Sequence, residues 1–282
     1  MIKISNKTPL ILEGGGDRGI FTSGVLDCFL EHKVMFPYVV GVSAGGFNAL
    51  SYISKQKGRQ RKTTLELSFK YKTTSFWKWL FSGNYLNDKI LFEDFVYKIN
   101  IFDFKAFFDN PSICEFVTTN CLTGKAMYLS ENKNKQHLLD ISKASGRLPI
   151  ICPMVMIGGI PMLDGGLSDS IPLKHALSLG YTDKPIVVLT QNKGYRKPKK
   201  TYKLAKLVYR HYPKFCETLK NRYKMYNSQL EFVEKLEREN KIIVIRPKSR
   251  ITLKHFNNKP SELKKMYDEG YSLALALIKK DV

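Results

Sequence analysis

A serine between two glycines is the residue of this chain best suited to act as a nucleophile. It lies in the segment Gly41-Val42-Ser43-Ala44-Gly45, between a β-prone run at 38–40 and a helix-prone run at 44–54. A strand that turns sharply into a helix needs small residues at the turn. Such a turn holds the serine hydroxyl at the sheet edge, above the helix N-terminus. The pattern predicts that Ser43 is a displayed nucleophile.

A glycine-rich segment earlier in the chain offers what a serine nucleophile needs for its developing oxyanion. Gly14-Gly15-Gly16-Asp17-Arg18-Gly19 follows a short apolar run at 10–12 and opens a helical pattern. Glycine lets backbone N–H groups approach a ligand closely, and a helix N-terminus favours negative charge. In acyl transfer, one such donor stabilises the transition state by about 3–4 kcal/mol. We therefore predict an oxyanion hole at Gly14, Gly15 and Gly16.

The same segment also fits a dinucleotide-binding fingerprint, with glycines at 14, 16 and 19. That interpretation requires an acidic residue roughly 20 positions later, at the end of a second strand. Residues 34–42 contain no Asp or Glu, and no Gly-Lys-Ser/Thr sequence marks a phosphate-binding P-loop. Nucleotide binding is therefore the less favoured interpretation.

A carboxylate followed by two glycines, Asp164-Gly165-Gly166, is the third candidate. On a tight turn, such a carboxylate can reach a hydroxyl held by another loop. The same three residues are also typical of an ordinary Asp-Gly turn.

A serine hydroxyl needs a base. In the chain order Ser, Asp, His, only His175, His211 or His255 could complete a triad, and none of them has a distinctive setting. The pair Ser43 and Asp164 is therefore the better hypothesis. An ordinary aspartate, with a pKa near 3.9, is a weak base for this task, but burial would raise the basicity of Asp164.

The elements around these residues alternate between strand and helix. The first 54 residues predict a β-α-β-α opening and therefore a parallel sheet. Further strands are predicted at 112–122, 127–129, 154–157 (before a Gly158-Gly159 turn), 186–190 and 242–245, and helices at 136–146, 214–239 and 261–278. Because the last strand is expected to join the main sheet, we predict one domain over 1–282. The basic C-terminal part, 193–282, is predicted to be integrated with it.

Together, the three segments resemble the patatin-like phospholipase family, in particular its bacterial members. The family pattern is a G-G-G-x-R-G loop, a later G-x-S-x-G turn and a much later D-G-A/G segment; the resemblance covers roughly 8–190. It implies an α/β fold, a three-layer α/β/α sandwich with a mainly parallel central sheet. It also implies Ser43 as nucleophile, Asp164 as base and N–H groups around Gly15 and Gly16 as oxyanion donors. The residues that support the motifs are Arg18, Gly19, Gly41, Ala44, Gly45, Gly165 and Gly166.

The resemblance implies a serine lipid acyl hydrolase of the phospholipase A or lysophospholipase type, with a lipid ester as substrate and with no cofactor and no metal. Two alternatives remain open. An acyltransferase would use the same serine with a different acceptor, and a lipid- or nucleotide-binding module would lack the chemistry.

Aromatic residues are concentrated at 60–110. Helices that pack on the sheet are the favoured interpretation of this segment. The alternative is an acyl-chain pocket or a lid with an aromatic edge that faces a membrane.

Composition limits the class of protein. The chain has 282 residues, 43% of them apolar, which is enough to bury a sizeable core. Its five cysteines are scattered, with no CxxC pair, which predicts reduced, mostly buried thiols. We find no signal-peptide pattern and no uninterrupted apolar stretch long enough for a membrane span, so we predict a cytoplasmic protein, with any membrane contact peripheral.

The net charge of +21 is concentrated in the C-terminal third. Residues 193–214 hold nine basic side chains and no acidic one. This run predicts either attraction to an anionic membrane or a basic face exposed to solvent without a partner. No nucleic-acid-binding module is recognisable, so a nucleic-acid partner is not expected.

Overall fold

The computed structural model describes residues 4–199, 203–248, 253 and 258–279. Within them, eight strands form one sheet in the order β5-β6-β3-β2-β1-β7-β8, with β4 also paired to β3. The strands are β1 (Pro9–Leu12), β2 (Tyr38–Val42), β3 (Ile113–Asn120), β4 (Ala126–Leu129), β5 (Val155–Ile157), β6 (Ile160–Asp164), β7 (Ile186–Val188) and β8 (Ile243–Ile245).

The centre of the sheet is parallel and its β5–β6 end is antiparallel. Strands β3, β2, β1, β7 and β8 pair in parallel, whereas β4 and β6 run antiparallel to β3, and β5 antiparallel to β6. All residues of β1, β2 and β7 are buried. Their continuous apolar sequences are typical of parallel strands covered on both faces.

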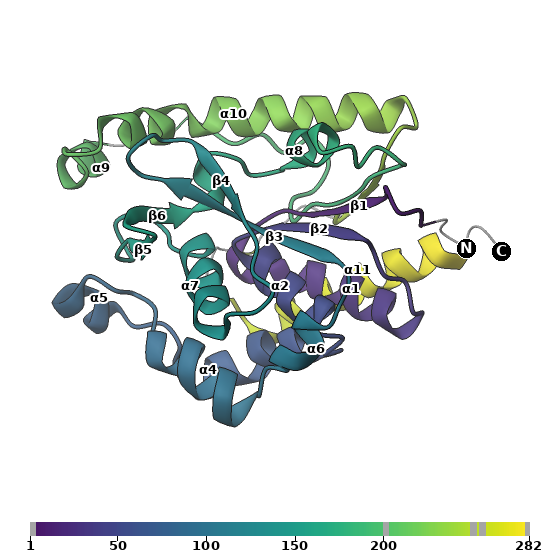
Figure 1. Cartoon of the computed structure of the whole chain (residues 1–282), viewed down its shortest axis with the longest axis horizontal. Helices are drawn as coiled ribbons and strands as arrows, with labels where there is room; N and C mark the ends of the chain where they lie inside the picture. Colours follow the sequence, from purple (N-terminus) through teal and green to yellow (C-terminus); the bar gives the residue numbers. More distant parts are fainter. Residues whose placement is uncertain (1–3, 200–202, 249–252, 254–257, 280–282) are drawn as a thin grey trace.

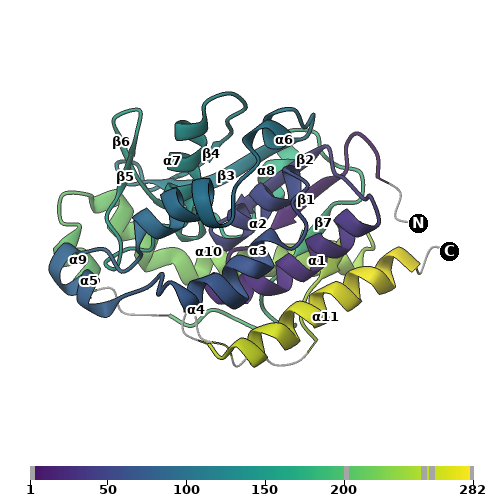
Figure 2. The same cartoon turned by 90° about the horizontal axis from the view of Figure 1, so that it is seen from below.

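Helices cover both faces of the sheet (Figures 1 and 2). Helices α8 and α10 lie on one face, and α1, α2, α7 and α11 on the other. This arrangement confirms the predicted three-layer α/β/α class. The α-helices are α1 (Ile20–Glu31), α2 (Ala44–Ile53), α3 (Arg59–Lys62), α4 (Ser68–Lys70), α5 (Phe76–Ser82), α6 (Phe104–Phe108), α7 (Lys135–Ser145), α8 (Leu173–Ser178), α9 (Lys203–Val208), α10 (Pro213–Arg238) and α11 (Pro260–Lys279).

Short helical segments of other types lie in the glycine-rich motifs and in the aromatic segment. Two are 3₁₀ helices, η1 (Gly16–Gly19) and η4 (Gly165–Leu167), and they coincide with the glycine-rich loop and the Asp-Gly-Gly turn. Two are π-helical, η2 (Thr63–Leu67) and η3 (Lys89–Ile99), and they lie in the aromatic segment. That segment is helical, as predicted.

The sequence did not predict β6. Pro161 argues against a strand, because proline cannot donate to a strand ladder. Even so, β6 pairs with β5 through a hairpin at Gly158-Gly159 and with β3 on its other side. Its last residue is Asp164, so this strand positions the predicted base.

The described portion of the C-terminal part contributes to the sheet and to a helix layer. Strand β8 pairs in parallel with β7, and α11 packs on α1. A Cβ atom on Gly24 would overlap the carbonyl oxygen of Tyr267, and one on Gly270 that of Phe21, so only glycine lets these two helices approach so closely. These contacts support our proposal that 193–282 is integrated into a single domain over 1–282.

Among the described residues, no helix combines the length and the apolarity needed to cross a membrane. All five cysteines are free thiols; Cys28, Cys114, Cys121 and Cys152 are buried and Cys216 is partly exposed.

Candidate active site

Ser43 stands between the end of β2 and the first residue of α2. Its backbone has φ 54° and ψ −119°, a region that side chains other than glycine rarely adopt and that stores strain. Its side chain does not cap α2, and its backbone N–H donates to Ser145 Oγ at 3.0 Å. The hydroxyl is therefore available for other contacts.

Small residues make this turn possible. A Cβ atom on Gly41 would lie 2.6 Å from the nitrogen of Gly46, and one on Gly45 would overlap the carbonyl oxygen of Leu12. A Cβ atom on Gly19 would lie 2.6 Å from that of Ala44, which places the start of α1 against the start of α2. Larger side chains at these positions would push Ser43 away from the sheet edge.

Asp164 lies beside Ser43. It is 2% exposed, its Oδ1 accepts the N–H of Gly166 at 2.7 Å, and it lines the same small pocket as Ser43. Gly165 packs against the carbonyl oxygen of Val117 on β3, where no Cβ atom would fit. The structure thus brings together the two residues that the sequence proposed as a pair.

Burial raises the pKa of the Asp164 carboxyl above its ordinary value. The positive charge of Arg222, the hydrogen bonds with Ser43 and Gly166, and the charge of Lys197 oppose this rise. Arg222 also donates from Nε to the carbonyl oxygen of Gly166 at 2.8 Å. A carboxylate made more basic by burial and placed beside a hydroxyl can accept the hydroxyl proton.

The glycine-rich loop lies next to Ser43. A Cβ atom on Gly14 would stand 3.0 Å from the Cβ of Ser43, and Gly16 has φ 58° where η1 begins. In the described part of the chain, no intramolecular hydrogen bond uses the N–H groups of Gly14, Gly15 or Gly16. These donors remain available to a ligand beside the Ser43 hydroxyl.

Glu13 braces this loop, and the sequence analysis missed it. Glu13 is 3% exposed and accepts hydrogen bonds from the Thr190 N–H at 2.6 Å and from the Tyr226 hydroxyl at 2.6 Å. Thr190 Oγ1 in turn donates to the carbonyl oxygen of Gly14 at 2.8 Å. The available signal was a glutamate at the end of a buried strand, since a buried charge needs partners.

The histidines make contacts elsewhere. His175 Nε2 is 2.7 Å from Glu115 Oε2, and its ring stacks on Tyr128. His211 is exposed beside Arg210, and His255 lies outside the described residues. Within the described chain, no histidine lines either of the pockets beside Ser43. The geometry of the described residues favours the pair over a triad that contains His175 or His211.

An apolar cavity of about 240 Å³ opens on one side of Ser43. Its walls come from α2, α7 and the aromatic segment, so some side chains of residues 60–110 line a cavity while others pack in the core. The apolar lining residues are Ala44, Phe47, Leu50, Phe69, Leu86, Leu91, Phe92, Phe95, Val96, Phe102, Leu139 and Leu148.

A polar pocket of about 40 Å³ lies on the other side of Ser43 and Asp164. Three basic side chains line it: Arg18, Lys197 and Arg222. Two of these cations, Lys197 and Arg222, come from the C-terminal part, where the sequence offered no motif.

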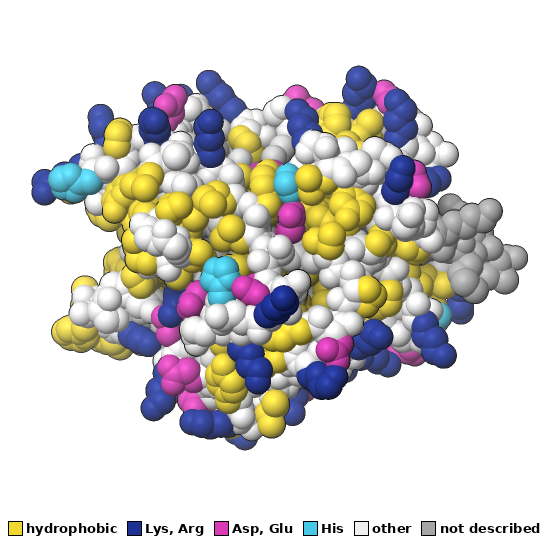
Figure 3. Space-filling model, viewed as in Figure 1, with side chains coloured by type: hydrophobic (Ala, Val, Ile, Leu, Met, Phe, Trp, Pro, Cys, Tyr) yellow, Lys and Arg dark blue, Asp and Glu magenta, His cyan; other side chains and the backbone are white. Residues whose placement is uncertain are grey.

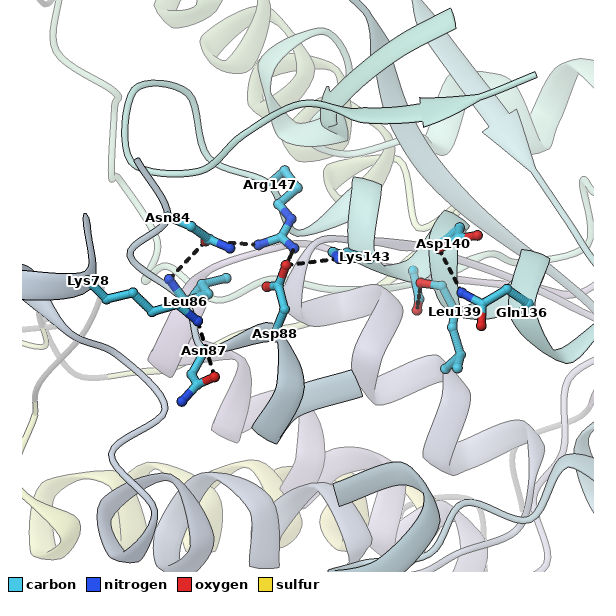
Figure 4. A network of polar contacts seen from close by, with 11 residues as sticks. Lys78, Asn84, Leu86, Asn87, Asp88, Gln136, Leu139, Asp140, Lys143 and Arg147 are labelled. Carbon is cyan, nitrogen blue, oxygen red and sulfur yellow. Dashed lines mark hydrogen bonds and ion pairs between the residues drawn. The ribbon is translucent and has the colours of Figure 1, made fainter. Parts of the chain in front are cut away.

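A buried arginine, Arg147, connects the aromatic segment to the strand that carries Asp164. Figure 4 shows its contacts with Asn84 and Asp88. Arg147 Nη2 is 2.6 Å from Asp88 Oδ2, which Lys143 also approaches at 2.9 Å, and Arg147 Nη1 donates to Asn84 at 3.3 Å. The backbone carbonyl of Arg147 accepts the N–H of Asp164 at 2.8 Å. The wall of the apolar cavity and the predicted base therefore share one anchor.

Comparisons with known proteins found a family model, related sequences and a structure of the same fold. Residues 10–177 match the family model described as "Patatin-like phospholipase", and residues 212–280 match a domain of unknown function (DUF6363). The chain is 31% identical over 193 residues to the uncharacterized protein YjjU of Escherichia coli, covering 64% of this chain and 50% of YjjU. It is 27% identical over 173 residues to the lysophospholipase NTE1 of Candida albicans, covering 61% of this chain and 12% of NTE1.

The chain therefore spans only part of these relatives: 50% of the length of YjjU and 12% of the length of NTE1. Among solved structures, VipD from Legionella pneumophila has the same fold, with a TM-score of 0.54 at 12% identity, over 97% of this chain and 67% of VipD.

Proposed function

The chain belongs to the patatin-like phospholipase family, and from this premise we propose that it is a serine lipid acyl hydrolase of the phospholipase A or lysophospholipase type. The observation that carries the proposal is the position of Ser43 and the buried carboxylate of Asp164 in the wall of one small pocket, beside an apolar cavity. The lysophospholipase named among the relatives supports a lipid ester as substrate.

The proposed mechanism uses Asp164 as the base. Asp164 accepts the Ser43 proton while the serine oxygen attacks the ester carbonyl, and N–H groups of Gly14, Gly15 and Gly16 stabilise the oxyanion. The alcohol leaves with the proton from Asp164. Water then attacks the acyl-enzyme and gives a proton to Asp164, which returns it to Ser43 as the fatty acid is released.

The two pockets suggest how the substrate lies. The apolar cavity fits an acyl chain, since its wall is aliphatic and aromatic. The polar pocket fits an anionic group such as a phosphate, because guanidinium and ammonium groups form strong charge-assisted hydrogen bonds with phosphate oxygens. This arrangement favours phospholipids over neutral esters.

The decisive experiment is mass-spectrometric profiling of a lipid extract incubated with the wild type, Ser43→Ala and Asp164→Asn. We expect the wild type to release fatty acid, and each variant to lose at least about 10³-fold in rate, as serine hydrolases do without a central residue. His175→Asn serves as the control and should keep most activity. Full activity in Ser43→Ala or Asp164→Asn would contradict the pair, and complete loss in His175→Asn would revive the triad.

The same assay separates the two alternatives. An acyltransferase would form new esters when alcohol or lysolipid acceptors are added. A binding module without chemistry would release no fatty acid, and a fluorophosphonate probe would not label its Ser43.

We also propose peripheral contact with anionic membranes through the basic part, 193–282, because residues 193–214 carry nine basic side chains and no acidic one. A cytoplasmic location stays a prediction.

A further inference from the structure

Large apolar side chains are exposed together at one end of the molecule. In α5, Trp77 is 67% exposed and Phe81 83%, and in α9, Leu207 is 68% exposed. Further exposed apolar residues of the same elements are Phe76, Leu80, Leu204 and Val208, with Met156 on β5. Figures 1 and 2 both place α5, β5 and α9 at this end, and Figure 3 shows hydrophobic side chains gathered there. Clusters of this kind mark interaction surfaces.

One loop residue holds both helices in place. The Trp79 indole N–H donates to the carbonyl oxygen of Ile150 at 3.0 Å, while the N–H of Ile150 donates to the Tyr209 hydroxyl at 2.7 Å, just after α9. Ile150 itself has φ 74°, a strained value for a β-branched residue. The exposed apolar side chains of α5 and α9 therefore belong to elements fixed to the same point.

The residues on either side of α5 also line the apolar cavity. Thr74 and Leu86, on either side of α5, form an isolated antiparallel bridge, and both line the cavity beside Ser43. Leu148, two residues before Ile150, lines it too. A lipid that reaches this end of the molecule is close to the cavity wall.

Basic residues accompany the apolar ones. From α9 to the start of α10, the exposed basic side chains are Lys203, Lys206, Arg210 and Lys214. Figure 3 shows dark blue Lys and Arg side chains at the same end, next to the hydrophobic ones. Aromatic and aliphatic side chains flanked by lysine and arginine suit the boundary between acyl chains and anionic headgroups.

We propose that α5 and α9 form a membrane-docking face, occupied by the surface of a bilayer that contains anionic lipids. Phe76, Trp77, Leu80 and Phe81 insert among the acyl chains together with Leu204, Leu207 and Val208 of α9, while Lys203 and Lys206 contact phosphate groups. Only one part of this inference rests on the proposed function, namely that a lipid substrate passes from this face to Ser43. Membrane docking itself does not depend on it. It also locates the proposed membrane contact on two particular elements, one of which lies outside the basic C-terminal part.

Tryptophan fluorescence tests this face directly, because the only two tryptophans of the chain, Trp77 and Trp79, both lie in α5. The full chain is mixed with vesicles of phosphatidylcholine alone or of an equimolar mixture of phosphatidylcholine and phosphatidylglycerol. We expect a blue shift of the emission and quenching by brominated acyl chains, stronger with the anionic vesicles and weaker as salt is added.

Binding to the same vesicles is then measured by co-sedimentation for Trp77→Ser/Phe81→Ser and for Leu204→Ser/Leu207→Ser. We expect each pair to weaken partitioning by about tenfold or more, since each removes two exposed apolar side chains. Leu179→Ser, at a similarly exposed leucine after α8, is the matched control and should stay within about twofold of the wild type.

Three results would overturn the inference: no blue shift in the wild type, wild-type partitioning in both double variants, or a wild-type dimer that these variants convert to a monomer. A failure of the proposed enzymatic function would give a different result from these three. If Ser43→Ala and the wild type both release no fatty acid but still bind vesicles, the docking face stands and the enzymatic proposal falls. The docking variants should hydrolyse a water-soluble short-chain ester at the wild-type rate.

Discussion

The two sides of Ser43 differ in size, in polarity and in their origin along the chain. On one side, an apolar cavity of about 240 Å³ is built from residues between 16 and 148, all within the part that matches the family model. On the other side, a polar pocket of about 40 Å³ takes Lys197, Arg222 and Tyr226 from beyond the matched residues. Ser43 and Asp164 lie where these two regions meet.

This difference suggests a division of roles. The segment up to residue 177 contains Ser43, Asp164 and every residue that lines the apolar cavity. Helix α10, all of which falls in the domain of unknown function, brings Arg222 and Tyr226 to the same pocket. We infer that the first segment determines the reaction and the acyl chain, and that the C-terminal part determines preference for the headgroup.

The largest expected effect that would test this division comes from Arg222→Leu. We expect kcat/KM to fall by about 10–100-fold on an anionic lysophospholipid, because a charge-assisted hydrogen bond contributes about 1.5–3 kcal/mol. On a neutral monoacylglycerol with the same acyl chain, the fall should be several times smaller. The ratio of the two substrates is the measurement, since any change in the basicity of Asp164 affects both.

Arg196→Leu is the matched control, because Arg196 is exposed and paired with Glu234 away from the pocket. It should leave the ratio unchanged. Equal losses of Arg222→Leu on both substrates would mean that Arg222 acts on Asp164 and not on the headgroup.

The apolar side can be tested with Thr64→Trp. Thr64 lines the cavity from η2, and an indole there would occupy part of the space that an acyl chain needs. We expect kcat/KM for long-chain esters to fall by about tenfold, while esters of short acids stay within about twofold. Thr64→Ser controls for loss of the methyl group. A uniform loss across chain lengths would place the acyl chain elsewhere.

Much of this architecture follows from local sequence. Continuous apolar runs such as Leu10-Ile11-Leu12 predict buried parallel strands, and the glycines around Ser43 predict the sharp turn, since both depend on neighbouring residues alone. The three motifs, taken together, identified the family.

The unpredicted parts depend on contacts between distant segments. Strand β6 forms despite Pro161 because β3 and β5 pair with it on both sides. Arg222 looks like any other basic residue of a long amphipathic helix, and only the packing of α10 over the sheet places it beside Gly166. The same holds for Glu13, whose partners Thr190 and Tyr226 are 177 and 213 residues away.

The smallest expected effect is on the stability of the folded protein. It concerns Asp164, which is buried between the apolar cavity and the polar pocket, because burying a carboxylate lowers the free energy of unfolding. Burial raises the pKa of its carboxyl in the folded protein above the value in the unfolded chain, which is about 3.9. At low pH the carboxyl is protonated in both the folded and the unfolded state, so its ionisation does not change the free energy of unfolding. As the pH rises from the unfolded pKa through the folded one, the unfolded state ionises more readily, and the free energy of unfolding of the wild type decreases.

Asp164→Asn replaces the carboxyl by a neutral side chain of the same shape and removes this loss. We expect the Tm of the variant to exceed that of the wild type at about pH 8, and the two to converge toward about pH 4, near the unfolded pKa. Each 1 kcal/mol of difference corresponds to about 2–4 °C for a chain of this size. Calorimetry over this pH range, with Asp140→Asn as a partly exposed control, provides the measurement. If Asp164→Asn is less stable than the wild type at pH 8, the attraction of Arg222 and Lys197 outweighs burial, and Asp164 is a weaker base than proposed.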